Sequence, residues 1–177
     1  MLLKVVQYPS TVIMLDMKSR LILMCGLPGS GKTTAAKNLA SSMPAVRLCP
    51  DDWLRGLGID LFDESVRDRL ECQLWSLAKE LLKLGQNVIL EFGFWSRSER
   101  DKKRLWAHDN DMTVELHFLD VPIPELLRRV QSRHSKDSDS EAHITRDHLE
   151  EWSRAFQTPD EDELRLFDPH QIAAESH

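Results

Sequence analysis

Short apolar runs alternate with segments of helical periodicity along this chain. Residues 21–25 form an unbroken apolar run, which predicts a central parallel strand buried on both faces. From residue 64 to 84, apolar side chains recur every three or four positions, and Gly85 stands where a helix ends in the left-handed conformation. Ser96 and Glu99 have capping-box spacing, which predicts a helix to about residue 106. The remaining elements are strands over residues 45–49, 88–92, 113–119 and 164–167, and helices over 31–40, 125–133 and 145–156.

This alternation defines the expected fold class, which is α/β. Right-handed crossovers between parallel strands place helices on both faces of a sheet. We therefore expect a three-layer α/β/α arrangement with a parallel sheet of about five strands. Residues 20–177 are predicted to form a single domain, and residues 1–19 an N-terminal extension. Ligands bind such sheets at the carboxyl ends of the strands, so functional residues are expected there.

The turn after the first strand carries the most specific motif. Residues 26–33 read Gly-Leu-Pro-Gly-Ser-Gly-Lys-Thr, which matches the phosphate-binding P-loop pattern and predicts a P-loop NTPase fold. Glycines at its first, fourth and sixth positions permit positive φ, so successive N–H groups can converge on one anion. ATP and Mg²⁺ are therefore the expected cofactors, with Lys32 near the β- and γ-phosphates and the Thr33 hydroxyl on Mg²⁺. The predicted nucleotide contacts are Gly26, Leu27, Pro28, Gly29, Ser30, Gly31, Lys32, Thr33, Thr34 and, from a later helix, Arg129.

Two carboxylates follow the second strand. Phosphoryl transfer to a hydroxyl needs a carboxylate that accepts the hydroxyl proton, and Asp51 or Asp52 is the candidate, with Asp51 first off the strand. The alternative is that one of them caps the next helix. Arg55 is expected either to orient the acceptor or to pair with one of these carboxylates.

The end of the third strand carries an acidic residue and aromatic residues. Glu91 ends an apolar strand, where a carboxylate is costly unless it is paired or near a cation. We expect Glu91 to bind Mg²⁺ through water, and a buried pair with an arginine is the alternative. Phe94, Trp95 and Arg97 are the predicted acceptor contacts, although core packing is also expected for at least one aromatic residue here.

Arg128, Arg129 and Arg133 precede a polar segment over residues 135–141. Cations at the end of a lid helix can close over the γ-phosphate and spread transition-state charge. The alternative is a favourable interaction with the dipole of the helix C-terminus. We expect a small lid over about residues 128–144, with Arg129 and Arg133 on one helix face as catalytic residues.

Composition narrows the class of protein. The chain has 177 residues, 41% hydrophobic and 29% charged, and no apolar run approaches the roughly 20 residues of a membrane span. Three cysteines without C-x-x-C spacing indicate neither a disulfide framework nor a zinc site, so a reducing cytoplasm is expected. The net charge of −6 disfavours polyanion binding by the molecule as a whole. No membrane partner is expected, and the protein is predicted to be a monomer or dimer.

The P-loop, Asp51-Asp52-x-x-Arg55, Glu91 and Arg129-x-x-x-Arg133 together resemble the P-loop kinase-like AAA_33 group of ATP-binding proteins. That group is similar to polynucleotide 5′-kinase, chloramphenicol phosphotransferase and zeta-toxin kinase domains. The resemblance covers about residues 20–160 and implies that Asp51 is the general base and that the arginines bind ATP phosphates. Polynucleotide kinases tend to have Asp-Asp-x-Arg, whereas two residues separate Asp52 from Arg55 here. No arginine-finger or sensor pattern of an unfoldase is present.

Three functions remain compatible with the sequence. The first is an ATP-dependent kinase that phosphorylates a hydroxyl of a small molecule of unknown identity. The second is a polynucleotide 5′-hydroxyl kinase, a less favoured alternative because the sequence has no basic stripe. The third is a non-catalytic ATP-binding switch module. The sequence has one basic cluster, which would contact a nucleic acid or form a solvated helix face. It consists of Arg97, Arg100, Lys102, Lys103 and Arg104.

Overall fold

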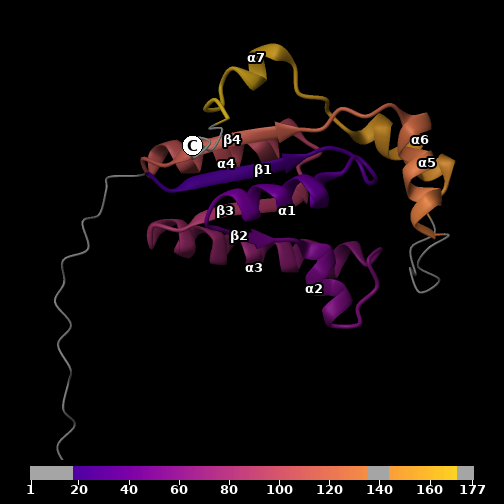
Figure 1. Ribbon diagram of the computed structural model, residues 1–177, viewed down its shortest axis with the longest axis horizontal. Helices are drawn as coiled ribbons and strands as arrows, with labels where there is room; N and C mark the ends of the chain where they lie inside the picture. The colour runs from indigo at the N-terminus through magenta and orange to yellow at the C-terminus, as the bar shows by residue number, and fades with distance from the viewer. Residues whose placement is uncertain (1–17, 135–143, 171–177) are drawn as a thin grey trace, which may run out of the picture.

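The computed structural model describes residues 18–134 and 144–170 (Figure 1). Within these residues the chain forms one parallel sheet of four strands in the order β2-β3-β1-β4. The predicted strands over residues 21–25, 45–49, 88–92 and 113–119 are confirmed to within a residue or two. The strands are β1 (Arg20–Cys25), β2 (Ala45–Leu48), β3 (Asn87–Gly93) and β4 (Thr113–Phe118).

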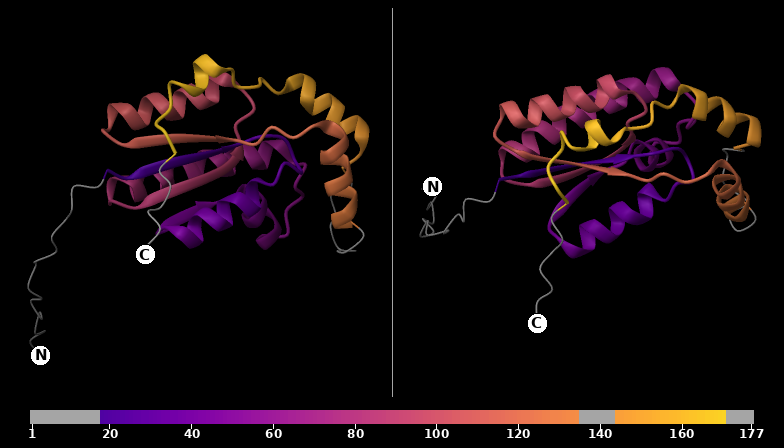
Figure 2. Two further views of the ribbon diagram at one scale, coloured as in Figure 1. Left: turned by 45° about the horizontal axis from the view of Figure 1, so that its top comes forward. Right: turned by 90° about the horizontal axis from the view of Figure 1, so that it is seen from above.

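Helices cover both faces of this sheet, as Figure 2 shows. On one face α1 (Lys32–Ser42) packs through Ala36 against Ile22, Met24 and Ile89. On the other face, α3 (Glu64–Lys83) and α4 (Arg97–Asp109) pack against the alternate strand positions. The predicted three-layer α/β/α class is therefore confirmed, with four strands in the described residues where about five were expected.

The carboxyl ends of the strands all point to one end of the molecule. Three further helices, α2 (Pro50–Gly56), α5 (Ile123–His134) and α6 (Arg146–Ala155), gather at that end (Figure 1). The P-loop lies there too, since it follows β1. The polar segment over residues 135–143, in which the predicted lid loop falls, lies outside the described residues, as do residues 1–17 of the predicted extension.

The predicted helix signals are present in the structure. Gly85 has a φ of 83° just after α3. The Ser96 side chain accepts from the Glu99 N–H and the Glu99 side chain accepts from the Ser96 N–H, which completes the capping box of α4. These local patterns set the helix boundaries because they satisfy amide groups that have no partner inside the helix.

The predicted strand over residues 164–167 is wrong. Residues 164–167 instead contain the end of a short helix, α7 (Glu161–Leu164), and the turn that follows it, and this helix begins at Glu161 because the Asp160 carboxylate accepts the Glu163 N–H at 2.7 Å. The chain then runs beside the outer edge of β4. The N–H of Asp168 donates to the Val114 carbonyl at 2.9 Å, and the Asp168 carboxylate accepts the Val114 N–H at 2.7 Å. His170 lies 3.1 Å from the Leu116 carbonyl, so the edge is covered without a regular strand.

None of the helices within residues 18–134 and 144–170 combines the length and apolar character needed to cross a bilayer.

Candidate functional site

The P-loop adopts the backbone conformation that its glycines predict. Gly26, Gly29 and Gly31 have φ angles of 143°, 85° and 102°. Gly26 donates its N–H to the Gly93 carbonyl at 3.1 Å, which joins the loop to the end of β3. A side chain at Gly29 would lie 3.0 Å from Cγ2 of Val130, so α5 packs directly against the loop. The loop is therefore held between β3 and α5.

Lys32 begins α1, and its amine is turned back into the loop. The Nζ atom donates to the carbonyls of Gly26 at 2.8 Å and Leu27 at 3.0 Å. Burial lowers the pKa of this amine to about 8, although the carboxylates of Asp51 and Glu91 act in the opposite direction. The negative charges of Asp51, which follows β2, and Glu91, on β3, thus both favour the protonated form of this partly buried amine.

Two buried oxygens at this end of the sheet have no hydrogen-bond partner. They are Oγ of Ser30, in the P-loop, and Oε2 of Glu91, on β3. Across the part of the chain that the structure describes, no other buried side-chain nitrogen or oxygen lacks a partner. Buried polar atoms in proteins are normally hydrogen-bonded, so each of these two oxygens is free to accept a hydrogen bond from water or from a ligand.

The other oxygen of Glu91 is paired. Nε of Arg47, from β2, donates to Oε1 at 2.7 Å, and Arg47 Nη2 also lies 3.5 Å from the Asp52 carboxylate. The arginine pair that the sequence left as an alternative therefore exists, and it leaves Oε2 available. Arg47 was not among the predicted site residues. The signal that was available is its position as a charged residue inside the apolar strand β2.

Asp51 and Asp52 occupy the first turn of α2 and have different partners. Asp51 accepts from Nη2 of Arg67 at 2.7 Å, and Arg67 also donates to the Leu61 carbonyl at 3.2 Å. Asp52 lies 3.7 Å from Nη1 of Arg55, whose side chain is 61% exposed. Arg55 therefore pairs with Asp52, which was one of its two expected roles. Arg67, the partner of Asp51, was not among the predicted site residues.

Arg129 lies on the face of α5 that meets the P-loop. Its Nη1 donates to the Ser30 carbonyl at 3.1 Å, and its Nε donates to Glu125 at 2.6 Å. Arg128 also donates to Glu125, at 2.7 Å, and hydrogen bonds from the two arginines lower the pKa of the Glu125 carboxyl to about 2. Arg133 belongs to α5, but its side chain lies outside the described residues.

The predicted acceptor residues after β3 have separate environments. Phe94 is only 2% exposed, has a φ of 49° and stacks on Phe92 in the core, so its assignment as an acceptor contact is corrected. Trp95 is half-buried and faces Trp152 of α6, with ring centroids 5.9 Å apart. Arg97 lies 3.5 Å from Asp160 and is 46% exposed. Of these three, Trp95 and Arg97 keep solvent-accessible surface and Phe94 does not.

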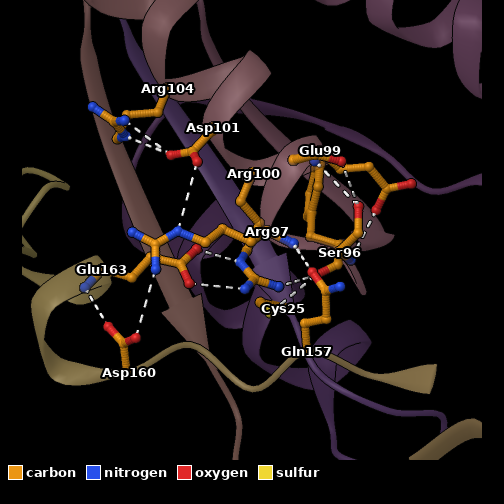
Figure 3. A network of polar contacts seen from close by, with 12 residues as sticks. Cys25, Ser96, Arg97, Glu99, Arg100, Asp101, Arg104, Gln157, Asp160 and Glu163 are labelled. Atoms are coloured by element: carbon orange, nitrogen blue, oxygen red, sulfur yellow. Dashed lines mark hydrogen bonds and ion pairs between the residues drawn. The ribbon is translucent and has the colours of Figure 1, made fainter. Parts of the chain in front are cut away.

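A buried ion pair fixes the backbone around Trp95 (Figure 3). Arg100 is fully buried and donates from Nε and Nη2 to the two oxygens of Glu163, at 2.6 and 2.9 Å. Its Nη1 donates to the carbonyl of Phe94 at 2.9 Å. Arg97 and Arg104 of the same helix both pair with Asp101. Of the basic cluster, Arg97, Arg100 and Arg104 are therefore paired with carboxylates of the same chain.

A cavity of about 210 Å³ adjoins the P-loop at Leu27 and Ser30. Its walls come from the loop, from the connection between β4 and α5, and from the chain around α6. The lining includes Leu27, Ser30, Phe118, Asp120, Phe156 and Thr158. The remaining predicted nucleotide contacts are Pro28 and Thr33, both half-buried, and Thr34, which is exposed.

The sheet order, the crossovers and the P-loop at the end of β1 define the fold of P-loop kinases. Three solved structures show that likeness. The first, the Pnkp1/Rnl/Hen1 RNA repair complex, is 22% identical over 86% of this chain and 47% of that chain, with a TM-score of 0.66. A gluconokinase from Sinorhizobium meliloti 1021 is 20% identical over 82% and 79%, with a TM-score of 0.56. The Mycobacterium tuberculosis APS kinase CysC, in complex with AMPPNP and APS, is 24% identical over 72% and 78%, with a TM-score of 0.52.

This chain belongs to the AAA_33 family, described as an AAA domain, whose sequence profile matches residues 21–159. It spans about half of the Pnkp1-complex chain that it matches. No curated protein sequence matches it.

Proposed function

We propose that this protein is an ATP- and Mg²⁺-dependent phosphotransferase that moves the γ-phosphoryl group to a hydroxyl of a small molecule. The observation that carries this proposal is the P-loop itself, in which glycines with positive φ hold the Lys32 amine turned back into the loop, at the end of the sheet that also carries Asp51 and the unpartnered Oε2 of Glu91. A cation that binds phosphate, a carboxylate that accepts a proton and a carboxylate with a free oxygen are the groups that phosphoryl transfer requires.

The residues around the P-loop fit a magnesium nucleotide. Mg²⁺ is usually bound by one or two side chains together with phosphate oxygens and water, and a dedicated protein cage is not needed. Thr33 and, through water, Oε2 of Glu91 would hold it, where it neutralises charge on the β- and γ-phosphates. In residues 18–134 and 144–170, no group of three or more His, Cys, Asp and Glu side chains is placed to hold a metal alone. The cavity beside Ser30 would take the nucleoside part of ATP.

The chain's own groups then have distinct tasks. Lys32 and Arg129 bind phosphate oxygens and spread the negative charge that develops during transfer. Asp51 accepts the proton of the acceptor hydroxyl, whose oxygen forms the new bond to phosphorus as the bond to ADP breaks. Asp51 is preferred to Asp52 as the base because it comes first after β2, whereas Asp52 lies close to both Arg47 and Arg55.

Substitution of Asp51 tests this proposal against a non-catalytic switch. We expect Asp51→Asn to lower phosphoryl transfer about 100-fold or more, because the proton acceptor is lost, and to leave the Kd for ATP within about twofold. Transfer is measured with γ-labelled ATP and Mg²⁺ against panels of nucleosides, antibiotics, sugars and 5′-hydroxyl oligonucleotides. Asp162→Asn, at a carboxylate that is 88% exposed, is the matched control. Absence of transfer by the unmodified chain to every acceptor would contradict the proposal.

A further inference from the structure

Four aromatic side chains from three separate segments form a continuous row at the carboxyl end of the sheet. Phe62 precedes α3, His148 and Trp152 lie one turn apart on α6, and Trp95 follows β3. Neighbouring ring centroids are 6.2 Å apart for Phe62 and His148, 5.6 Å for His148 and Trp152, and 5.9 Å for Trp152 and Trp95. We call these four side chains the aromatic row. None of them has a task in the chemistry proposed above.

The aromatic row remains accessible at its surface. Phe62 is 45% exposed, and the other three rings are half-buried. Aromatic residues whose only role is to fill a core are normally covered, as Phe94 is at 2% exposure. Rings that contact one another and also face solvent form a surface on which another flat ring can stack.

Both ends of the aromatic row adjoin the proposed catalytic groups. Arg67 donates to Asp51 and also to the carbonyl of Leu61, the residue before Phe62. At the other end, a Cβ atom at Gly93 would lie 3.0 Å from Nε1 of Trp95 and 3.7 Å from the Gly26 carbonyl of the P-loop. A molecule that lies along the row therefore has Asp51 near one end and the P-loop near the other.

Backbone contacts hold the row in place before any ligand binds. The Trp95 carbonyl accepts from the Gln157 N–H at 2.9 Å and from Arg100 at 3.4 Å. The Thr145 N–H donates to Nδ1 of His148 at 3.3 Å, so in the neutral imidazole the proton resides on Nε2. The aromatic row thus offers the faces of its rings and the Nε2–H donor of His148. These side chains need little rearrangement when a ligand binds.

We propose that the aromatic row binds the phosphoryl acceptor and that this acceptor carries a planar unsaturated ring close to its reacting hydroxyl. This proposal rests on the proposed function, because it names the substrate class of the same site. A flat ring gains stacking contacts with Trp152 and Trp95, and a ring acceptor atom can accept from His148. An open-chain polyol or a sugar needs a polar partner for each hydroxyl, and the row offers mostly carbon surface.

Binding of acceptor probes tests the row independently of phosphoryl transfer. Equilibrium dialysis of the full chain, saturated with AMPPNP and Mg²⁺, is carried out with adenosine, uridine, 3-phenylpropanol, glucose and sorbitol. We expect saturable binding of probes that contain a planar ring and none of glucose or sorbitol. Comparison of adenosine and uridine with 3-phenylpropanol shows whether the site binds a nucleobase or a phenyl ring. Saturable binding of glucose or sorbitol, or of no probe that contains a ring, would overturn the proposal.

Variants in the row then separate stacking from a general loss of structure. Trp152→Ala is expected to weaken binding of the ring probe about tenfold or more, whereas Trp152→Phe, which keeps a ring, should change it less than about threefold. Leu84→Ala, at an apolar side chain 75% exposed at the opposite end of α3, is the control. Equal binding by the unmodified chain and Trp152→Ala would show that the row is only packing.

The outcomes for the two proposals are distinguishable. If ring probes bind through Trp152 but the chain transfers no phosphoryl group from ATP, the row is supported as a site for planar rings, and both the phosphotransferase proposal and the role of that ring as acceptor fail. If transfer to glucose or sorbitol occurs and Trp152→Ala leaves its KM unchanged, the phosphotransferase proposal is supported and the row fails. A 5′-hydroxyl oligonucleotide bound more than about 100-fold tighter than any nucleoside would replace the small-molecule acceptor with a nucleic acid and overturn this form of the proposal.

Discussion

Two buried glutamates, each paired with an arginine from another segment, differ in one respect. Glu163 uses both carboxylate oxygens, which accept from two nitrogens of Arg100. Glu91 uses only Oε1 with Arg47, and its Oε2 has no partner. The side chains of both glutamates are 1% exposed. Both glutamates are therefore buried and paired with an arginine. They differ in that both carboxylate oxygens of Glu163 are hydrogen-bonded, whereas only one oxygen of Glu91 is.

The location of each pair explains that difference. The pair of Arg100 and Glu163 joins α4 to α7 and fixes the chain after β3 (Figure 3). The pair of Arg47 and Glu91 lies near the P-loop, where a magnesium nucleotide would supply the missing partner. We infer that the first pair stabilises the fold and the second pair holds a functional oxygen in place.

The largest expected effect is on stability. Arg100→Leu leaves the Glu163 carboxylate buried without its partner, so the free energy of unfolding should fall by about 3–5 kcal/mol. Urea denaturation measures it. Adding Glu163→Leu should restore part of the loss, because no buried charge then remains unpaired. Arg165→Leu, at an exposed arginine, is the control and should cost much less. A loss for Arg100→Leu no greater than that of the control would remove the structural role of this pair.

A slightly smaller effect is expected at the P-loop. Lys32→Ala removes the cation nearest the phosphates, so turnover should fall about 100- to 1,000-fold. Steady-state kinetics with ATP and Mg²⁺ measure it. Lys37→Ala, an exposed lysine on the same helix, should leave turnover unchanged. Unchanged turnover in folded Lys32→Ala protein would refute the assignment of the P-loop.

The same substitution at the two glutamates compares them directly. Glu91→Gln keeps a side chain of the same shape but removes its charge, so the Mg²⁺ concentration needed for half-maximal nucleotide binding should rise about tenfold. Glu163→Gln should leave that concentration unchanged and lower the urea midpoint more than Glu91→Gln does. Calorimetric titrations and urea denaturation give the two quantities. Identical behaviour of the two variants would mean that the unpartnered oxygen has no special role.

The smallest effect is a proton linked to binding. Because the pKa of Lys32 is lowered to about 8, its amine is about half protonated at pH 8 in the free protein. Phosphate binding favours the ammonium form, so nucleotide binding should take up about half a proton at pH 8 and close to none from this group at pH 6.5. Calorimetry in buffers of different ionisation enthalpy measures the uptake. The same uptake in Lys32→Ala protein would assign it to another group.

The sequence predicts the features whose cause is local. The P-loop glycines, the capping box at Ser96 and Gly85 after α3 each follow from a few adjacent residues, and the apolar runs give the strands because burial imposes their pattern. The contacts that complete the site, in contrast, join residues far apart in the sequence. Arg47 with Glu91 spans 44 positions, and Arg100 with Glu163 spans 63. No local periodicity encodes such pairs, so Arg47 and Arg67 were missed.

Two wrong predictions have identifiable physical causes. The run over residues 164–167 looks like a strand, but Asp160 caps the preceding turn and starts a helix instead, which makes α7. Asp160 and Glu163 have the spacing of an N-terminal helix signal, so the sequence contained the cue. Phe94 follows a strand end as a ligand contact would, but it stacks on Phe92 in the core, the alternative expected for at least one aromatic residue here.

The chain segment beside β4 has a consequence for self-association. An outer strand with free amide and carbonyl groups is a template on which a second copy can add its own strand. Here Asp168 occupies both backbone groups of Val114, and His170 occupies the carbonyl of Leu116. Because this cover is irregular, it blocks the edge without presenting a new pairing surface of its own. The segment after α7 thus protects the β4 edge of the sheet from pairing with another strand.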